Sequence, residues 1–356
     1  MRGEFKEGLK MEFLQQIGLF FLEALIIVVS LIAIILTIAS VAIKNKNQKS
    51  IDLEIINDKM DEQRRALNSV LLDEDELKIE KKRLKKEEKD KSKKNEKRPR
   101  VYVLDFLKGD VQASQVDQFK EEINALLTVA QKDEEVIVQV ESPGGIVHGY
   151  GLAAAQLLRL REAGLKVTIT VDKVAASGGY MMACVAHQII CSPFAIVGSI
   201  GVVAQVPNFN KLLKKHDIDY KEYTAGDFKR TVSIFGEITD KGEQKFVEQL
   251  EATHLLFKSF VGQFRPQLDL AKVATGEYWF GQDALKLGLV DHIQTSDDYI
   301  LGKTKSHQVI KLSIEKKPTL SEKISQLVSA TISLSLQKTF RGIENSGKAV
   351  KHLENL

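Results

Sequence analysis

Short β-branched runs alternate with helical repeats from Val101 onward, and this alternation leaves few folds open to the chain. The runs that read as strands are 101–106, 135–140 and 166–171. Apolar residues recur at helical spacing from Val116 to Leu127, and 149–163 and 240–264 also have helical patterns. Strands that alternate with helices favour βαβ units. We therefore predict an α/β domain built on a buried, mainly parallel sheet.

Two motifs of small residues stand where predicted strands end. Residues 142–145 read SPGG, and residues 175–179 read AASGG. Ligands and catalytic groups collect at the carboxyl ends of parallel strands. Paired glycines leave backbone N–H groups that can stabilise an oxyanion, and a serine at a helix start can be approached closely between small neighbours. Each motif alone is also typical of a tight turn or a helix cap.

A serine nucleophile needs a base, and the residues alone do not identify one. None of the seven histidines has a distinctive setting. A buried lysine can replace histidine, because desolvation favours its neutral form. Lys229, delivered by a turn at Gly226, is a reasonable candidate. A lysine in such a position is more often an ordinary surface residue than a catalytic base.

Several motifs in order make residues 100 to 300 resemble the signal peptide peptidase A family, and most closely its SohB-type membrane-anchored proteases. The motifs are SPGG at 142–145, VDKVAASGGYMMAC at 171–184, VGSIGVV at 197–203, TAGDFKRT at 224–231 and TGEYWFGQDALKLGLVD at 275–291. The resemblance implies a crotonase- or Clp-protease-like ββα spiral. It also implies a serine endopeptidase that works through a Ser–Lys dyad and an acyl-enzyme.

The resemblance assigns roles to individual residues. Ser177 matches the nucleophile and Lys229 the general base, while Ser199 matches the serine that hydrogen-bonds and orients the lysine. Gly144 matches the oxyanion position, and the N–H group of Gly178 is our own addition to it. No cofactor or metal is required, and the sequence has neither a Walker-type loop nor clustered metal ligands.

The expected partners follow from the same reading. The substrates would be peptides or proteins, such as signal-peptide remnants or misfolded proteins, and Met181 or Met182 suggests an apolar binding preference. The family implies a homo-oligomer with active sites at or near subunit interfaces. A net charge of +3 gives no reason to expect nucleic acid. Two other functions stay open: an acyl-CoA-processing crotonase-like enzyme and an inactive scaffold of the same fold.

An uncharged run of twenty residues from Ala24 to Ile43 is long enough to span a bilayer as a helix. We predict five segments: a flank at 1–16, a retained transmembrane helix at 17–43, a charged tether at 44–99, the protease domain at 100–316 and an amphipathic tail at 317–356. The chain is expected in the bacterial inner membrane as a single-pass protein.

The side of the membrane that holds the catalytic domain is open. Lys44, Lys46 and Lys49 follow the apolar run, so the positive-inside rule places the domain in the cytoplasm. Family precedent places it in the periplasm. Cys184 and Cys191 lie in apolar surroundings and are predicted to be buried free thiols, which do not decide the compartment.

Overall fold

The computed structural model of the protein describes residues 29–30, 49–94 and 98–316. Contacts between residues divide the chain into two compact units. One is Ile51–Ile314, and the other consists of Met1–Ser50 and Glu315–Leu356. The first unit holds the predicted strands, the predicted helices and every predicted site residue, so the description below concerns it.

The predicted flank at 1–16 and tail at 317–356 lie outside the described residues, as does the predicted transmembrane helix at 17–43 apart from Val29 and Ser30. None of the helices that the structure describes combines the length and the apolar character needed to cross a membrane. Of the predicted tether, the described part holds one strand and two helices, one of them strongly charged.

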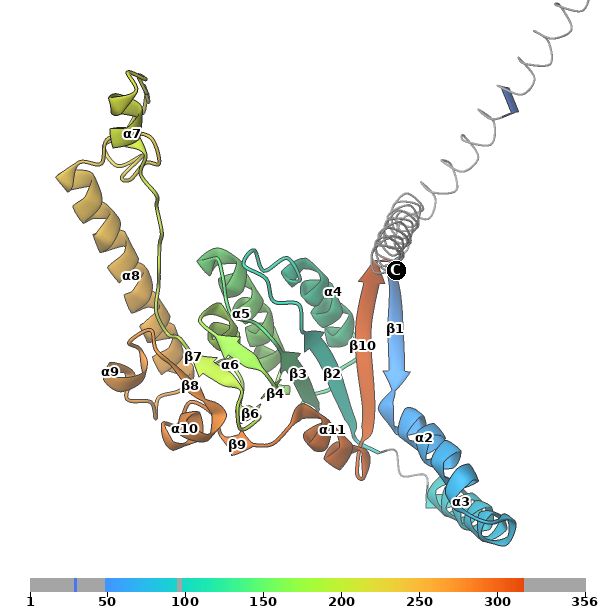
Figure 1. The fold of residues 1–356 in the computed structure, drawn as a ribbon. Helices are drawn as coiled ribbons and strands as arrows, with labels where there is room; N and C mark the ends of the chain where they lie inside the picture. The colour runs from blue at the N-terminus through green and yellow to red at the C-terminus, as the bar shows by residue number, and fades with distance from the viewer. Residues whose placement is uncertain (1–28, 31–48, 95–97, 317–356) are drawn as a thin grey trace, which may run out of the picture. The chain divides into compact units, whose positions relative to one another are not determined.

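A seven-stranded sheet has the order β1-β10-β2-β3-β4-β6-β9. Its strands are β1 Lys49–Ile55, β2 Arg100–Phe106, β3 Glu135–Val140, β4 Lys166–Val171, β6 Gln188–Cys191, β9 His292–Ile293 and β10 Gln308–Lys316. Every pairing from β10 to β9 is parallel. The three strands predicted from the sequence are therefore confirmed as β2, β3 and β4, and so is the parallel α/β class (Figure 1).

A second sheet has the order β5-β7-β8. Its strands are β5 Val174–Ala176, β7 Ile196–Gly198 and β8 Tyr278–Phe280. Along the chain, β4 belongs to the large sheet, β5 to the small sheet, and the helix α6 (Gly178–Ala183) follows. The chain goes on with β6 in the large sheet and β7 in the small one. This repeat agrees with the expected ββα pattern.

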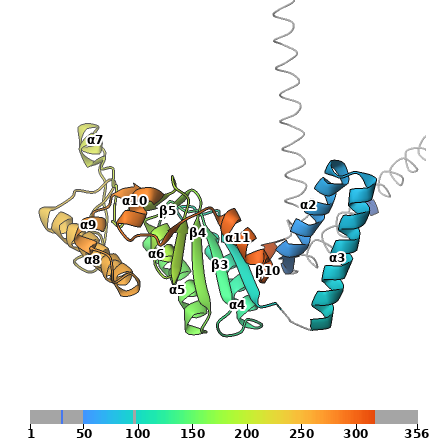
Figure 2. The same ribbon diagram turned by 90° about the horizontal axis from the view of Figure 1, so that it is seen from below.

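Helices cover both faces of the large sheet. The helices among the described residues are α2 Ile56–Leu71, α3 Glu74–Lys94, α4 Val116–Leu127, α5 Val147–Glu162, α6 Gly178–Ala183, α7 Asn210–Lys215, α8 Asp240–Phe264, α9 Leu270–Val273, α10 Gly281–Lys286 and α11 Ser296–Thr304, and not all of them pack on the sheet. Leu104 and Phe106 of β2 belong to the main core with α4 and α5, whereas Val101 and Val103 pack with Ile300 of α11. Figure 2 shows α4 and α5 on one side of the sheet and α11 on the other. This alternation explains why the strands read as continuous apolar runs.

Residues 201–239 form an arm that connects β7 to α8 and carries α7, which Figure 1 shows beyond one end of α8. The tip of the arm is held by its own contacts. The side-chain amide of Asn208 donates to the carbonyl oxygens of Ser233 at 2.8 Å and Gly236 at 2.9 Å. The rings of Tyr220 and Phe235 lie 5.8 Å apart. The arm is therefore internally supported.

Both cysteines are buried and unpaired, as predicted. Burial raises the pKa of the Cys191 thiol to about 12 and that of Cys184 further still. Thiols of this kind stay protonated near neutral pH and are poor nucleophiles. They are packing residues of the core.

Candidate active site

Ser177 occupies a strained turn between β5 and α6. Its backbone has φ 51° and ψ −118°, a region that residues other than glycine rarely adopt. Two hydrogen bonds hold this geometry: the Ser177 N–H donates to the Gly198 oxygen at 2.8 Å, and its carbonyl accepts from the Met181 N–H at 2.9 Å. Because Ser177 precedes a helix, the amides of Gly178 and Gly179 have no acceptor within that helix. The turn presents a half-buried hydroxyl beside free backbone donors.

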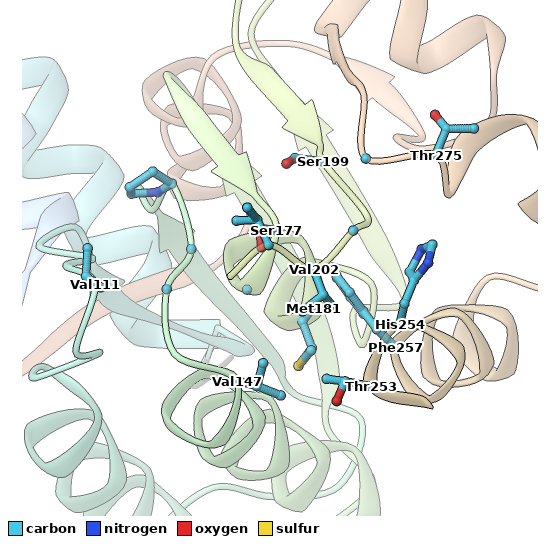
Figure 3. Close-up of a pocket in the computed structure, with 17 residues that line it drawn as sticks. Val111, Val147, Ser177, Met181, Ser199, Val202, Thr253, His254, Phe257 and Thr275 are labelled. Atoms are coloured by element: carbon cyan, nitrogen blue, oxygen red, sulfur yellow. The ribbon is translucent and has the colours of Figure 1, made fainter. Parts of the chain in front are cut away.

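Ser199 lies beside Ser177 on the neighbouring strand end. β5 and β7 pair in parallel with Ala176 opposite Gly198, and each serine follows one of these partners. Neighbouring strands are about 4.8 Å apart, so the two residues leave the sheet one strand spacing from each other. Ser199 also has φ 51°, and its N–H donates to the Glu277 oxygen at 2.6 Å. Figure 3 shows both serines at the cavity.

The SPGG segment borders Ser177 on the other side. The Ser142 N–H donates to the Val174 oxygen at 2.9 Å, so the segment extends the small sheet next to β5. Gly144 has φ +89°, and a Cβ there would lie 2.7 Å from Ser177 Cβ and 2.6 Å from the Gly178 nitrogen. Only glycine allows this approach.

The amides of the two SPGG glycines differ in their bonding. The Gly144 N–H donates to Ser142 Oγ at 3.1 Å. The Gly145 N–H donates to no acceptor among the described residues, and Gly145 is exposed. The structure therefore brings Gly144 against Ser177, while the Gly144 N–H is bonded to Ser142.

A cavity of about 630 Å³ opens at this point. The two glycine segments and both serines form one wall. The apolar side chains around it are those of Val111, Val147, Met181, Val202, Val203 and Phe257. Of the two methionines that the sequence singled out, Met181 lines the cavity, whereas Met182 is fully buried and does not. The lining next to Ser177 therefore suits an apolar side chain.

Helix α8 supplies cavity residues that the sequence analysis did not identify. Thr253 and Phe257 lie four residues apart on one face of α8, and His254, the residue after Thr253, also lines the cavity. His254 Nε2 lies 3.1 Å from the backbone oxygen of Ile200, the residue that follows Ser199 in the sequence. The helical period identifies such a face, but the sequence does not say which face meets the cavity. Within the described ranges, no cluster of three or more potential metal ligands occurs.

Lys229 is the predicted site residue that the structure does not bring to the others. It lies on the arm between α7 and α8, is exposed, and does not line the cavity. Its N–H donates to the Gly226 oxygen at 3.2 Å, and the next residue, Arg230, pairs with Glu222 at 2.7 Å. Among the described residues that line the cavity, His254 is the only histidine, and none is a lysine, an aspartate or a glutamate.

Comparison with known proteins gives consistent matches. The family model for the N-terminal part of peptidase family S49 matches residues 12–157, and the model for peptidase family S49 matches residues 159–310. A probable protease SohB of Haemophilus influenzae is 49% identical over 322 residues, which cover 87% of this chain and 91% of that protein. A probable protease SohB of Buchnera aphidicola subsp. Schlechtendalia chinensis is 44% identical over 307 residues, 82% of this chain and 100% of that protein.

Solved structures give a weaker likeness. A membrane-bound stomatin-specific protease, solved as a mutant with a substrate peptide, is 16% identical to this chain. It aligns with a TM-score of 0.39 over 65% of this chain and 99% of that one.

Proposed function

The chain belongs to peptidase family S49, and from this premise we propose that it is a serine endopeptidase with Ser177 as nucleophile and Lys229 as general base. The observation that carries the proposal is the strained turn at Ser177, which faces a cavity between two glycine segments. Backbone strain of this kind persists only where the surroundings fix it, and it concentrates at functional sites.

The proposed reaction is acyl transfer to serine. The neutral amine of Lys229 accepts the Ser177 proton, and the serine oxygen attacks the carbonyl carbon of a peptide bond. Backbone amides stabilise the oxyanion: Gly178 at the start of α6 and one amide of the SPGG segment. Gly145 offers a free N–H, while the Gly144 N–H would first have to leave Ser142. The amine of the cleaved peptide bond leaves with the proton that Lys229 took from Ser177. Water then hydrolyses the acyl-enzyme.

We propose that Lys229 reaches Ser177 from the arm of a neighbouring copy in a homo-oligomer. Lys229 is exposed on a self-supporting arm, and no lysine is among the described residues that line the cavity. The arm also exposes large apolar side chains, with Val203 80% and Tyr223 89% accessible. Exposed apolar surface favours association. Ser199, at the cavity, would orient the incoming amine.

The proposed substrates are extended peptides with apolar side chains, as in signal-peptide remnants or misfolded proteins. Met181 and Phe257 form an apolar wall beside Ser177, which favours an apolar residue there. The apolar run within 17–43 is proposed to anchor the chain in the bacterial inner membrane. Neither proposal requires a cofactor.

Peptidase turnover by the full-length protein in detergent tests this function. The substrates are an apolar fluorogenic peptide and casein, and the variants are Ser177→Ala, Lys229→Ala and His254→Ala. We expect the first two to abolish turnover and the third to retain it. If Lys229→Ala retained turnover and His254→Ala lost it, His254 rather than Lys229 would be the general base. Equal turnover in all variants would refute the proposal.

A further inference from the structure

A buried series of hydrogen bonds runs beneath the SPGG segment. The Gly144 N–H donates to Ser142 Oγ at 3.1 Å, and Ser142 Oγ donates to Tyr150 Oη at 2.6 Å. Tyr150 Oη in turn donates to the Asp110 oxygen at 2.7 Å. Ser142 and Tyr150 both have 0% exposure. All three donors point the same way along the series, so the bonds polarise and strengthen one another.

Tyr150 also touches the other side of the nucleophile. A Cβ on Gly178 would lie 2.4 Å from Tyr150 Cγ, so the ring packs directly against the first residue of α6. The ring of Phe106 lies 6.3 Å away, edge-on, and limits its movement. Tyr150 therefore supports Gly178 through its ring and Gly144, by way of Ser142, through its hydroxyl.

The far end of the series fixes a wall of the cavity. Asp110 precedes Val111, which lines the cavity, and the Val111 oxygen accepts from the Ile146 N–H at 2.9 Å. The loop before α4 is thus bonded to Ser142 through Tyr150. It is also bonded to the residues on either side of the SPGG segment, because Gly109 N–H donates to the Glu141 oxygen at 3.2 Å and Val111 accepts from Ile146. If these positions served only to fill the core, phenylalanine at 150 and alanine at 142 would pack equally well. Buried hydroxyl groups cost free energy unless they form hydrogen bonds, so the two hydroxyl groups indicate a role for their bonds.

We propose that Ser142 and Tyr150 are positioning residues for the oxyanion-binding backbone. Neither touches the substrate; they hold the 143–145 segment and Gly178 at the separation that a tetrahedral intermediate requires. The bond from the Gly144 amide to Ser142 Oγ keeps that amide out of the site and leaves Gly145 and Gly178 as the donors. The inference rests on the proposed peptidase function and adds the residues that set its geometry.

The test compares Tyr150→Phe, Ser142→Ala and the double variant with wild type in full-length protein. Tyr180→Phe is the matched control, because Tyr180 is also fully buried and donates to a carbonyl, that of Leu289 at 2.8 Å, away from the cavity. We measure kcat and KM for a peptide and inhibition by a peptide aldehyde, which forms a tetrahedral adduct with serine. Peptide binding is measured separately in the Ser177→Ala background.

Loss of one oxyanion donor lowers kcat by about 100- to 1000-fold, and displaced donors should lower it by about 10- to 100-fold. We expect that fall in Tyr150→Phe and Ser142→Ala, with a similar weakening of the aldehyde. KM and peptide binding should stay within about threefold, because the ground state does not use these donors. The double variant should be no worse than the poorer single one, since both interrupt one series. Tyr180→Phe should match wild type.

Three results would overturn the inference. Wild-type kcat in Tyr150→Phe, while Ser177→Ala is inactive, would remove the positioning role and leave the peptidase function intact. A faster Ser142→Ala enzyme would mean that Ser142 competes with the oxyanion for the Gly144 amide. An inactive wild type that also fails to bind the aldehyde would refute the peptidase function and, with it, this inference.

Discussion

Ser177 and Ser199 follow directly opposed residues of two parallel strands, and both have a φ of 51°. The Ser177 N–H donates to the oxygen of Gly198, the residue before Ser199. Two strained serines are thus held together by one backbone hydrogen bond. A shift of either turn would move the other, so the pair behaves as one rigid element of the cavity wall.

Replacement of Ser199 by alanine tests whether the Ser199 hydroxyl contributes to the reaction. If Ser199 orients the general base, Ser199→Ala should lower kcat by about 10- to 100-fold, within the range of a positioned acid–base group. Ser199→Thr, which keeps the hydroxyl, is the conservative comparison. Kinetics across pH provide the check, because the apparent pKa of kcat/KM should change in Ser199→Ala. An unchanged profile with unchanged kcat would remove Ser199 from the site.

Mixing two inactive variants tests whether Lys229 acts across a subunit interface. Co-expression of Ser177→Ala with Lys229→Ala in equal amounts should restore about a quarter of wild-type turnover, because random assembly places both native residues at that share of interfaces. Each variant alone should be inactive. The measurement is turnover of the co-purified oligomer. No recovery, in an oligomer shown to contain both variants, would mean that the lysine acts within its own chain.

Gly144 is predicted to reject any side chain. Gly144→Ala should lower turnover at least about 100-fold, because its Cβ would force the segment away from Ser177 and its φ of +89° disfavours alanine. The matched control is Gly302→Ala, since a Cβ on Gly302 meets nothing within 4 Å and the residue lies in α11. That change should retain turnover. Activity close to wild type in Gly144→Ala would show that the segment tolerates displacement.

The sequence predicted the strands well because they have few alternatives. β3 and β4 have the predicted bounds and β2 starts one residue earlier. Runs of valine and isoleucine buried on both faces fit a parallel sheet and little else. The sequence also placed Ser177 between a strand end and a helix, but the strand is β5 of the small sheet, which was not predicted. The position of Lys229 could not be predicted, because it depends on the direction of the arm, and no local sequence pattern specifies that direction.

The support beneath the site was also invisible in the sequence. Tyr150 falls within a helical repeat and reads as an ordinary core residue, and its bond to Ser142 depends on how α5 packs on the SPGG segment. The cavity face of α8 is hidden for the same reason. Periodicity identifies a helix, whereas tertiary packing decides which of its residues serve the site.

A buried carboxyl group, that of Glu122, and a partly buried one, that of Glu135, give predictions of opposite sign for stability. Desolvation raises the pKa of Glu122, which is 1% exposed, although Gln118 and the Ile314 N–H donate to it. The folded state therefore binds the proton more tightly than the unfolded state, and stability falls as pH rises above the unfolded value of about 4.3. Glu122→Gln removes this penalty and should raise Tm by about 2 to 4 °C near neutral pH.

Glu135 is the matched comparison. Burial opposes its ionisation, but hydrogen bonds from Lys303, Tyr299 and Thr168 outweigh it and hold the pKa of Glu135 below its usual value. Its contribution is present above the unfolded pKa and lost as pH falls through the folded pKa. Glu135→Gln should therefore lower Tm by about 2 to 4 °C near neutral pH. Thermal melts at neutral pH and at about pH 4 check both changes, and both shifts should shrink at the lower pH. Shifts of the same sign for the two variants at neutral pH would contradict this account of the two carboxyl groups.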